Sequence, residues 1–292
     1  MSLVLDIAVT HVRFRVRQTL IAMLGVATGV AFSIMMAALL QGSQEDFIKT
    51  LVDSLAHVSI TDESRTAEPQ PAELAFDAAQ IRSLKPRDVR RGIKNPSETI
   101  AILESSVGDG VAPYVTTRGI VRVAGRDYGV AILGIDPRRD PRVSKLKEQM
   151  KQGRIEDLST AANAVIIGAR LADKLGASVG SRINLVASTG ASIQSQVAGI
   201  FRAGIQSLDE GQVYTLIRTA QVLLGRTGYI NEIRVRLPDP MAAREAASVI
   251  EARIGYKSVS WQEAQEDLLS AFTIRNIIMF TVVGAILLVA SL

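Results

Sequence analysis

Two long uncharged runs, one near each end of the chain, limit its possible folds more than any other feature. The first, LIAMLGVATGVAFSIMMAALL, extends from Leu20 to Leu40. The second, IIMFTVVGAILLVASL, extends from Ile277 to Leu292. A helix of about 20 apolar residues crosses a hydrocarbon core about 30 Å thick. We therefore expect two membrane-spanning helices with a large folded region between them.

Each run has an alternative interpretation. Basic residues precede the first run and Ala37 and Ala38 are small, as in a secretory signal peptide. The apolar region of a signal peptide is shorter, about 7–15 residues, so we interpret the run as an anchor. The second run reaches Leu292 without a polar flank. It is either an anchor that ends abruptly or the front of a longer membrane protein, and we favour the longer protein.

The charges around the first run predict its orientation. Arg13, Arg15 and Arg17 precede it, and mainly acidic residues follow it. Basic residues flank membrane helices on the cytoplasmic side. The N-terminus is therefore expected in the cytoplasm and the region between the runs on the outer side. The leading segment 1–18 has mixed apolar and polar residues, which is typical of either an interfacial helix or a plain basic flank.

Helical periodicity continues beyond both runs. After the first run, an apolar stripe comprises Phe47, Ile48, Leu51, Val52, Leu55 and Val58. Before the second run, a similar stripe comprises Trp261, Ala264, Leu268 and Phe272. These stripes predict two stalks that pack against each other, or two stalks that each dock on the folded domain. Within the first run, Gly25 and Gly29 form a G-x-x-x-G pattern, which favours close approach of another helix.

The middle of the chain reads as mixed α and β structure. The predicted strands are Gly119–Ala124, Tyr128–Ile135, Ala164–Gly168, Arg182–Ala187, Ile193–Phe201, Gln212–Ile217, Asn231–Leu237 and Lys257–Ser260. The predicted helices are Thr99–Val107, Ala169–Leu175, Thr219–Gly225 and Met241–Ile254, the last capped by Asp239. This order predicts an α+β fold with two subdomains, one of them richer in strands. The first strand, His57–Thr61, is expected beside the last.

Three local patterns add detail. Strict alternation over Asn231–Leu237 predicts a strand with its charged residues facing outward. The run DPRRDPR over Asp136–Arg142 predicts a solvated loop, or a site for an acidic partner or a lipid headgroup. Prolines within Asp62–Ala75 predict a loop. The expected domains are 1–18, 19–57 (first span and stalk), 58–260 (outer domain) and 261–292 (stalk and second span).

Sequence motifs for catalysis, cofactors and metals are few. GASVG over Gly176–Gly180 matches G-x-S-x-G, but the nucleophile elbow needs a strand before the serine and a later histidine. Here a helix precedes it, and the last histidine is His57. The chain has no cysteine, no phosphate-binding G-x-x-x-x-G-K-[ST] and no paired histidines. We therefore predict no catalytic, cofactor-binding or metal-binding residue and, with 4% aromatic residues, no nucleic-acid partner.

Several segments, taken in order, resemble the permease subunits of lipoprotein-releasing (Lol-type) ABC transporters and the related macrolide-exporter and FtsX-like permeases. They are LDIAVTHVRFRVRQT before the first span, LGIDP at Leu133–Pro137, AVIIGARLADKLG with VGSRINL within Ala164–Leu185, VAGIF at Val197–Phe201, TAQVLL near Gln221, and the tryptophan helix Trp261–Phe272. The resemblance covers essentially the whole chain, as many weak matches in order.

The resemblance implies a function. The chain would be the N-terminal part of an inner-membrane permease of the mechanotransmission type, with its main domain in the periplasm. Such a permease is not itself an enzyme. It works with a separate ABC ATPase subunit and a second permease subunit, as a homo- or heterodimer, within membrane lipid. A periplasmic protein or a lipoprotein is a further candidate partner.

The chain departs from the resembling families in two respects. Two further spans and the segment that meets the ATPase are not in this sequence. The long loop of the carrier-recruiting subunit corresponds here only to Ser188–Ser192, which puts carrier recruitment in doubt. The alternatives are an FtsX-like regulator that activates a cell-wall hydrolase and a membrane-anchored periplasmic binding domain.

Overall fold

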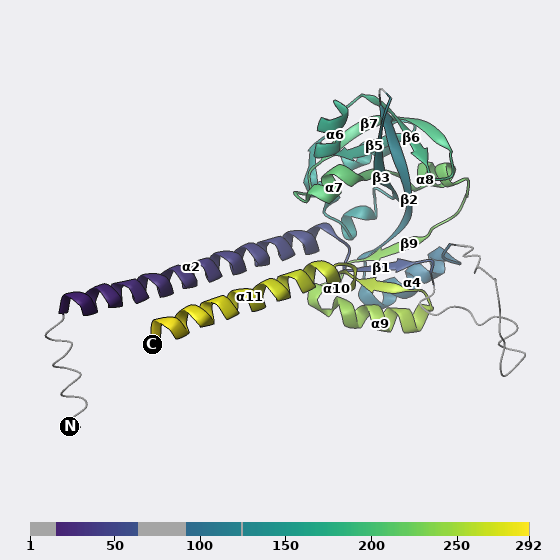
Figure 1. The fold of residues 1–292 in the computed structure, drawn as a ribbon. Coiled ribbons are helices and arrows are strands. Elements are labelled where there is room, and N and C mark those ends of the chain that lie inside the picture. The colour runs from purple at the N-terminus through teal and green to yellow at the C-terminus, as the bar shows by residue number, and fades with distance from the viewer. Residues whose placement is uncertain (1–15, 64–91, 124, 292) are drawn as a thin grey trace, which may run out of the picture. The chain divides into compact units, whose positions relative to one another are not determined.

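The fold was obtained as a computed structural model, which describes residues 16–63, 92–123 and 125–291 (Figure 1). The chain divides into two units. One unit comprises Met1–Lys49 and Gln265–Leu292, and we call it the helix unit. The other comprises Thr50–Ala264, and we call it the core unit. Each is described by itself.

The described part of the helix unit consists of two long helices. Helix α2 runs from Val16 to Ser54, and its last turn belongs to the core unit. Helix α11 runs from Glu266 to Ser291. By length and composition both can cross a membrane, and neither apolar stretch is buried. The hydroxyls of Thr28 and Ser33 donate to carbonyls four residues earlier, at 2.7 and 2.9 Å.

The core unit contains a small antiparallel sheet. Its strands, in spatial order, are β10 (Ser258–Ser260), β1 (Val58–Thr61), β9 (Glu232–Val235) and the first part of β2 (Val111–Val123). Val58 lies opposite Ser260, which confirms that the first and last predicted strands are neighbours. Helix α4 (Pro96–Val107) packs on β2, and α9 (Ala243–Ile254) packs on β10 and β1.

The rest of the core unit is built on a closed barrel. Its strands are β2, β3 (Arg126–Ile135), β8 (Gln212–Leu216), β5 (Ala164–Gly168), β7 (Ser192–Phe201) and β6 (Arg182–Ala187). Each strand pairs with the next, and β6 closes the ring by pairing with β2 (Figure 1). Closure leaves these strands no free edge between them. A short strand, β4 (Met150–Gln152), adds to β7 outside the ring.

Strand β2 belongs to both subdomains. Its first residues, Val111–Tyr114, pair with β9 in the sheet. From Val115 onward it pairs with β3, and Gly119–Arg122 pair with β6. A single strand therefore connects the sheet to the barrel at the step from Tyr114 to Val115.

Two apolar clusters form the barrel subdomain's core. The first contains inward-facing barrel residues, including Val121, Ile132, Val165, Ile183, Leu185, Val197 and Val213. The second contains residues of the opposite strand faces and of the segment between β3 and β5, including Leu133, Ile135, Val143, Leu146, Ile155, Leu158, Ile166 and Phe201. Strands buried on both faces read as continuous apolar runs, as in the fully buried AVIIG of β5.

Short helices link the strands. They are η1 (Asp140–Arg142), α5 (Leu146–Gln149), η2 (Ile155–Ser159), α6 (Ala169–Leu175), α7 (Gln206–Gly211), α8 (Ile217–Leu224), η3 (Pro240–Ala242) and α10 (Trp261–Ala264). Gly168, the last residue of β5 before α6, has a specific steric role. A Cβ atom there would lie 2.1 Å from the carbonyl oxygen of Asp209, so only glycine fits without a shift.

The predicted α+β fold is confirmed, and several elements match closely. Strands β5 and β6 and helix α6 have the predicted bounds. The side chain of Asp239 caps the turn before α9 by accepting a hydrogen bond from the amide of Met241. Residues 1–15 and 64–91 lie outside the described part of the chain. The expectations for the leading segment and for most of Asp62–Ala75 therefore have no structural counterpart here.

Two local predictions are wrong. The first stripe does not stay helical to Val58, because α2 ends at Ser54 and Val58 lies in β1. The charged residues of β9 do not face solvent. Glu232 is 8% exposed, and the side chain of Arg234 is 17% exposed. The alternation identified the strand correctly, but the face expected outward lies at the contact between sheet and barrel.

Candidate functional site

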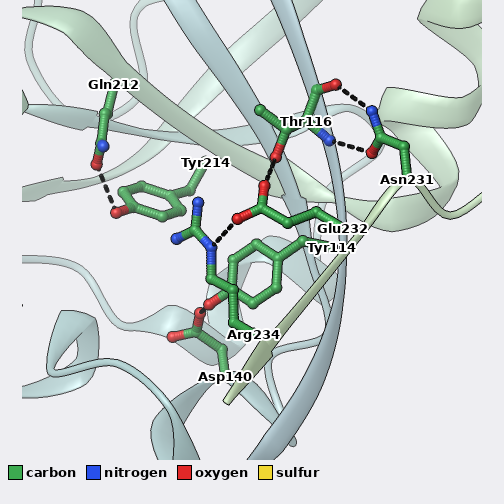
Figure 2. Close-up of polar contacts among 8 residues, drawn as sticks. All are labelled: Tyr114, Thr116, Asp140, Gln212, Tyr214, Asn231, Glu232 and Arg234. Atoms are coloured by element: carbon green, nitrogen blue, oxygen red, sulfur yellow. Dashed lines mark hydrogen bonds and ion pairs between the residues drawn. The ribbon is translucent and has the colours of Figure 1, made fainter. Parts of the chain in front are cut away.

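A buried polar network surrounds the point where β2 passes from the sheet into the barrel (Figure 2). Tyr114 pairs with Glu232 at the end of the β2–β9 ladder. One residue further, the side chain of Asn231 extends the pairing. It accepts from the amide of Thr116 at 2.8 Å and donates to the carbonyl of Thr116 at 2.7 Å.

An ion pair forms the centre of this network. The Arg234 Nε donates to Glu232 Oε1 at 2.7 Å, and the hydroxyl of Thr116 donates to the other oxygen of Glu232. The guanidinium of Arg234 lies over the ring of Tyr114, 4.1 Å from its centroid. Tyr214 of β8 completes the shell by donating to Gln212 at 2.7 Å (Figure 2). Sheet and barrel therefore share one set of charge-assisted contacts.

The electrostatics follow from this pairing. Burial by itself would raise the pKa of Glu232, but the Arg234 charge and the hydrogen bonds from Arg234 and Thr116 hold that pKa below its usual value. Burial would lower the pKa of Arg234, and the Glu232 carboxylate raises it. Both groups therefore stay charged at neutral pH. Because both groups are buried, each charge is stable only while its partner stays beside it.

The segment Asp136–Gln149, between β3 and β4, has a structural role that the sequence did not reveal. Asp140 is fully buried and accepts hydrogen bonds from the hydroxyls of Tyr114 and Ser144. Its burial raises its pKa. Arg139 pairs with Glu104 of α4 at 2.8 Å. The expectation of a solvated loop is therefore wrong for Asp140, whose carboxylate ties this segment to β2.

The last turn of α2 contacts both subdomains. Asp53 Oδ2 lies 2.8 Å from Lys145 Nζ, and Asp53 Oδ1 lies 3.7 Å from Arg236 Nη2. Ser54 Oγ accepts from Gln149 Nε2 at 3.1 Å. Lys145 and Gln149 belong to the barrel side, and Arg236 directly follows β9 of the sheet. One helical turn therefore carries polar contacts to both.

Within the helix unit, α2 and α11 meet through a small group of side chains. The rings of Phe47 and Phe272 lie 6.0 Å apart in an edge-to-face arrangement. Arg275 donates to Gln44 Oε1 at 2.6 Å, and its guanidinium lies 5.1 Å from the Phe272 centroid. The pairs 47–272 and 44–275 run in opposite directions along the two helices, so the helices are antiparallel here.

The other residues selected from the sequence occupy different surroundings. A Cβ atom added at Gly25 or Gly29 would meet nothing within 4 Å, so no described part of this chain packs closely there. Leu51 is buried in the core unit, and Leu55 follows the end of α2 and is half-buried. Leu268, in α11, is also half-buried.

Trp261 belongs to the core unit. It is 4% exposed, and its indole Nε1 donates to the carbonyl of Pro240 at 2.8 Å. Its amide donates to the carbonyl of His57 at 3.0 Å. Helix α10, which begins at Trp261, ends at Ala264, and α11 begins at Glu266. The tryptophan therefore fixes the start of this helical stretch to the β1 and α9 region.

The G-x-S-x-G motif is a turn, as its helix-before-strand context predicts. Gly176 caps α6 in the left-handed conformation, and the amide of Ser178 donates to Ser181 Oγ at 3.0 Å. The connection between β6 and β7 is equally short. Ala187 donates to the carbonyl of Ala191 across Ser188–Ala191. In the part of the chain that the structure describes, no group of three or more His, Cys, Asp or Glu side chains is placed to hold a metal ion.

A hollow of about 660 Å³ opens beside the turn between β6 and β7. Its walls include Arg118 and Ser188, and also Arg226, whose guanidinium lies 5.0 Å from the ring centroid of Tyr229. Thr116 and Asn231, two members of the buried polar network described above, also line it. The hollow therefore borders the polar network that connects sheet and barrel.

Comparison with known proteins identifies the class and then the family. Curated relatives include the lipoprotein-releasing system transmembrane protein LolC of Neisseria meningitidis, 24% identical over 285 residues, which are 94% of this chain and 63% of that protein. LolC of Xylella fastidiosa is 22% identical over 88% of this chain and 59% of that protein.

Residues 19–253 match the model of one protein family. The chain is of the ABC transporter permease class. Within that class it belongs to the family of the MacB-like periplasmic core domain. It spans about three fifths of the length of the LolC relatives.

Solved structures to which this chain shows similarity include the periplasmic region of MacB from Actinobacillus actinomycetemcomitans, 14% identical, with a TM-score of 0.41 over 72% of this chain and 91% of that one. The extracellular domain of the noncanonic ABC-type transporter YknZ from Gram-positive bacteria is 19% identical, with a TM-score of 0.40 over 56% of this chain and 87% of that one.

Proposed function

We propose that this chain is the N-terminal part of a permease that transmits mechanical movement. ATP hydrolysis on a separate ATPase subunit would move α2 and α11, and these helices would move the periplasmic domain, residues 58–260. The observation that carries the proposal is the continuity of α2, which is one helix from Val16 to Ser54 and whose last turn is built into the core unit. A continuous helix can carry a displacement along its length.

The burial of the last turn supports this proposal. Leu51 and Val52 are 5% and 7% exposed, so the turn is embedded in the core unit rather than joined to it by a loose linker. The basic residues before the first span favour a cytoplasmic N-terminus, and the domain would then lie in the periplasm, anchored in the inner membrane.

Further helices are expected to pack against α2 and α11. Their apolar side chains are widely exposed, including Ile21, Leu24, Phe32, Ile34, Leu39, Ile277, Ile278 and Phe280. Gly25 and Gly29 offer a close approach on α2. We therefore propose association with a second permease subunit, as a homo- or heterodimer, and contact with membrane lipid.

We propose lipoprotein release or export as the process served, because the curated relatives are lipoprotein-releasing system proteins. The short turn Ser188–Ala191 gives no support to recruitment of a periplasmic carrier by this chain. The alternatives remain an FtsX-like regulator of a cell-wall hydrolase and an anchored binding domain. Neither has a specific observation in its favour.

The test is reconstitution of the full-length permease in lipid with a candidate ABC ATPase subunit. We expect the two to co-purify and the permease to change the ATPase rate. An ATPase that neither binds nor responds would overturn the proposal and favour the anchored binding domain. Pull-downs with the periplasmic domain then distinguish the partners, since a lipoprotein supports release and a peptidoglycan hydrolase supports the FtsX-like alternative.

A further inference from the structure

We propose that Asp53, in the last turn of α2, is the positioning residue that passes movement of this helix to the barrel through Lys145. The inference rests on the proposed function and deepens it, because it names the contact at which a displaced helix would act. It follows from the geometry of a single carboxylate placed between cations of the two subdomains.

The carboxylate of Asp53 contacts each subdomain with a different oxygen. Oδ2 lies 2.8 Å from Nζ of Lys145, and Oδ1 lies 3.7 Å from Nη2 of Arg236. Lys145 lies between β3 and β4, on the barrel side, whereas Arg236 follows β9 in the sheet. A shift of the helix end toward one cation lengthens its distance to the other. The turn is therefore placed to change how the subdomains are held.

The contact continues from Lys145 into the barrel through hydrogen bonds, because the amide of Gln149 donates to the carbonyl of Lys145 at 3.0 Å. Ser54, next to Asp53, accepts from Gln149. The carbonyl of Gln149 accepts from the amide of Arg202 at 2.9 Å, and Met150 of β4 pairs with Phe201 of β7. The path from the helix end to a barrel strand therefore consists of adjacent contacts.

The exposure of the pair suits a positioning role better than a stabilising one. The side chains of Asp53 and Lys145 are 34% and 31% exposed, so solvent screens their attraction and the pair adds little to the free energy of unfolding. Leu51 and Val52 already hold the turn in the core unit by burial. Loss of the pair should therefore change coupling more than stability.

The test is a double-mutant cycle in the full-length permease reconstituted with its ATPase. We expect D53N and K145Q each to reduce the permease-dependent change in ATPase rate about threefold or more, within the range for substitutions along coupling paths. The double variant D53N/K145Q should lose no more than D53N alone, since K145Q removes a contact that D53N has already removed. D53E and K145R keep the charges and should retain at least half of the effect.

A matched control lies in the same segment. Lys147 pairs with Glu156 at 3.2 Å, and both side chains are more than half exposed. The change K147Q removes the same kind of charge without touching α2 and should leave the ATPase response at the wild-type level. The structural readout is thermal unfolding, and we expect the unfolding midpoint of D53N to lie within a few degrees of the wild-type midpoint.

The outcomes separate the two proposals. A wild-type permease without effect on the ATPase overturns the proposed function. A responsive wild type with D53N indistinguishable from K147Q overturns the role of Asp53 alone. Additive losses in D53N/K145Q overturn the pairing with Lys145. A loss of response in D53N that matches a collapse of thermal stability overturns a positioning role in favour of a structural one.

Discussion

The contacts inside the helix unit differ in kind from the contacts inside the core unit. In the helix unit, α2 and α11 are linked by one aromatic pair and a polar cluster around Gln44, and their apolar side chains are mostly exposed. In the core unit, a barrel closes on itself around two apolar clusters, and a buried ion pair joins barrel to sheet.

This difference indicates where each unit finds its stability. Burial of apolar area is the main favourable term in folding, and the core unit satisfies it internally. In the helix unit the apolar side chains are expected to be covered by groups outside this chain, either lipid or other helices. Substitutions in the core unit should therefore change unfolding of the isolated protein, whereas those in the helix unit should change assembly.

The largest effect is expected for Arg234→Met. This change leaves Glu232 buried without its cation, and breaking a buried pair in this way costs about 3–5 kcal/mol. Urea unfolding of the detergent-solubilised protein measures it. The control is Arg122→Met, which breaks an ion pair of similar length, 2.6 Å against 2.7 Å, whose side chains are about half exposed. Because solvent screens this pair, that change should cost far less than the change at Arg234. Equal losses would contradict the structural role of the Glu232–Arg234 pair.

A smaller but clear loss is expected for Gly168→Ala. The new Cβ would lie 2.1 Å from the carbonyl oxygen of Asp209, which is backbone and cannot turn aside. Overpacking of this kind costs about 1–3 kcal/mol. Gly129→Ala, in β3, is the control, because a Cβ there meets nothing within 4 Å among the described residues. A wild-type unfolding midpoint for Gly168→Ala would mean that β5 and α7 are less closely packed than described.

The next effect depends on pH and involves His57. Its Nδ1 accepts from the amide of Leu237 at 3.0 Å, so the ring is held neutral. Burial, followed by the charge of Arg236, lowers the pKa of His57 below its ordinary value. Since the unfolded chain binds the proton more readily, this contribution is complete above about pH 6.5 and is lost as the pH falls toward the lowered folded pKa.

We therefore expect the unfolding midpoint of the wild type to fall on acidification from about pH 7 to pH 5.5. In His57→Asn the side-chain oxygen still accepts from Leu237 but does not titrate, and the fall should be smaller. Identical pH profiles for the two proteins would exclude His57 as the source.

The smallest effect on unfolding is expected for Phe47→Ala. An aromatic pair contributes about 0.5–1.5 kcal/mol, and this one lies in the helix unit. The unfolding midpoint of the core unit should therefore not change. Cysteines at positions 47 and 272 should instead form a cross-link in membranes, while a pair at 45 and 272 should not. Equal cross-linking of both pairs would show that the two helices lack a defined register.

Much of the secondary structure was predictable because local patterns encode it. The β5–α6 unit was placed to the residue, since an apolar β-branched run followed by a helical period and a glycine cap is a local signal. The closed barrel was not predictable, because closure requires β6 to pair with both β7 and β2, and β2 lies about sixty residues away in sequence.

Sequence reasoning did not find the buried polar network around Glu232 and Arg234, for a related reason. Alternation along β9 separates two faces but does not say what covers each. The signal available was that Glu232 and Arg234 have opposite charges and lie two residues apart, hence on one face of the strand. Such a pair is suited to burial, but only the β2–β9 register places it against Tyr114 and Thr116.

The sequence by itself determined that the chain has two long apolar helices, an α+β region between them and neither a phosphate-binding loop nor a cysteine, because hydrophobic periodicity, length and composition are local quantities. Only the tertiary structure decided that β2 joins a sheet to a barrel, that Arg234 is a buried cation and that Asp53 lies between Lys145 and Arg236. These depend on which distant backbone segments pair, and the burial and partners of a charge follow from that pairing.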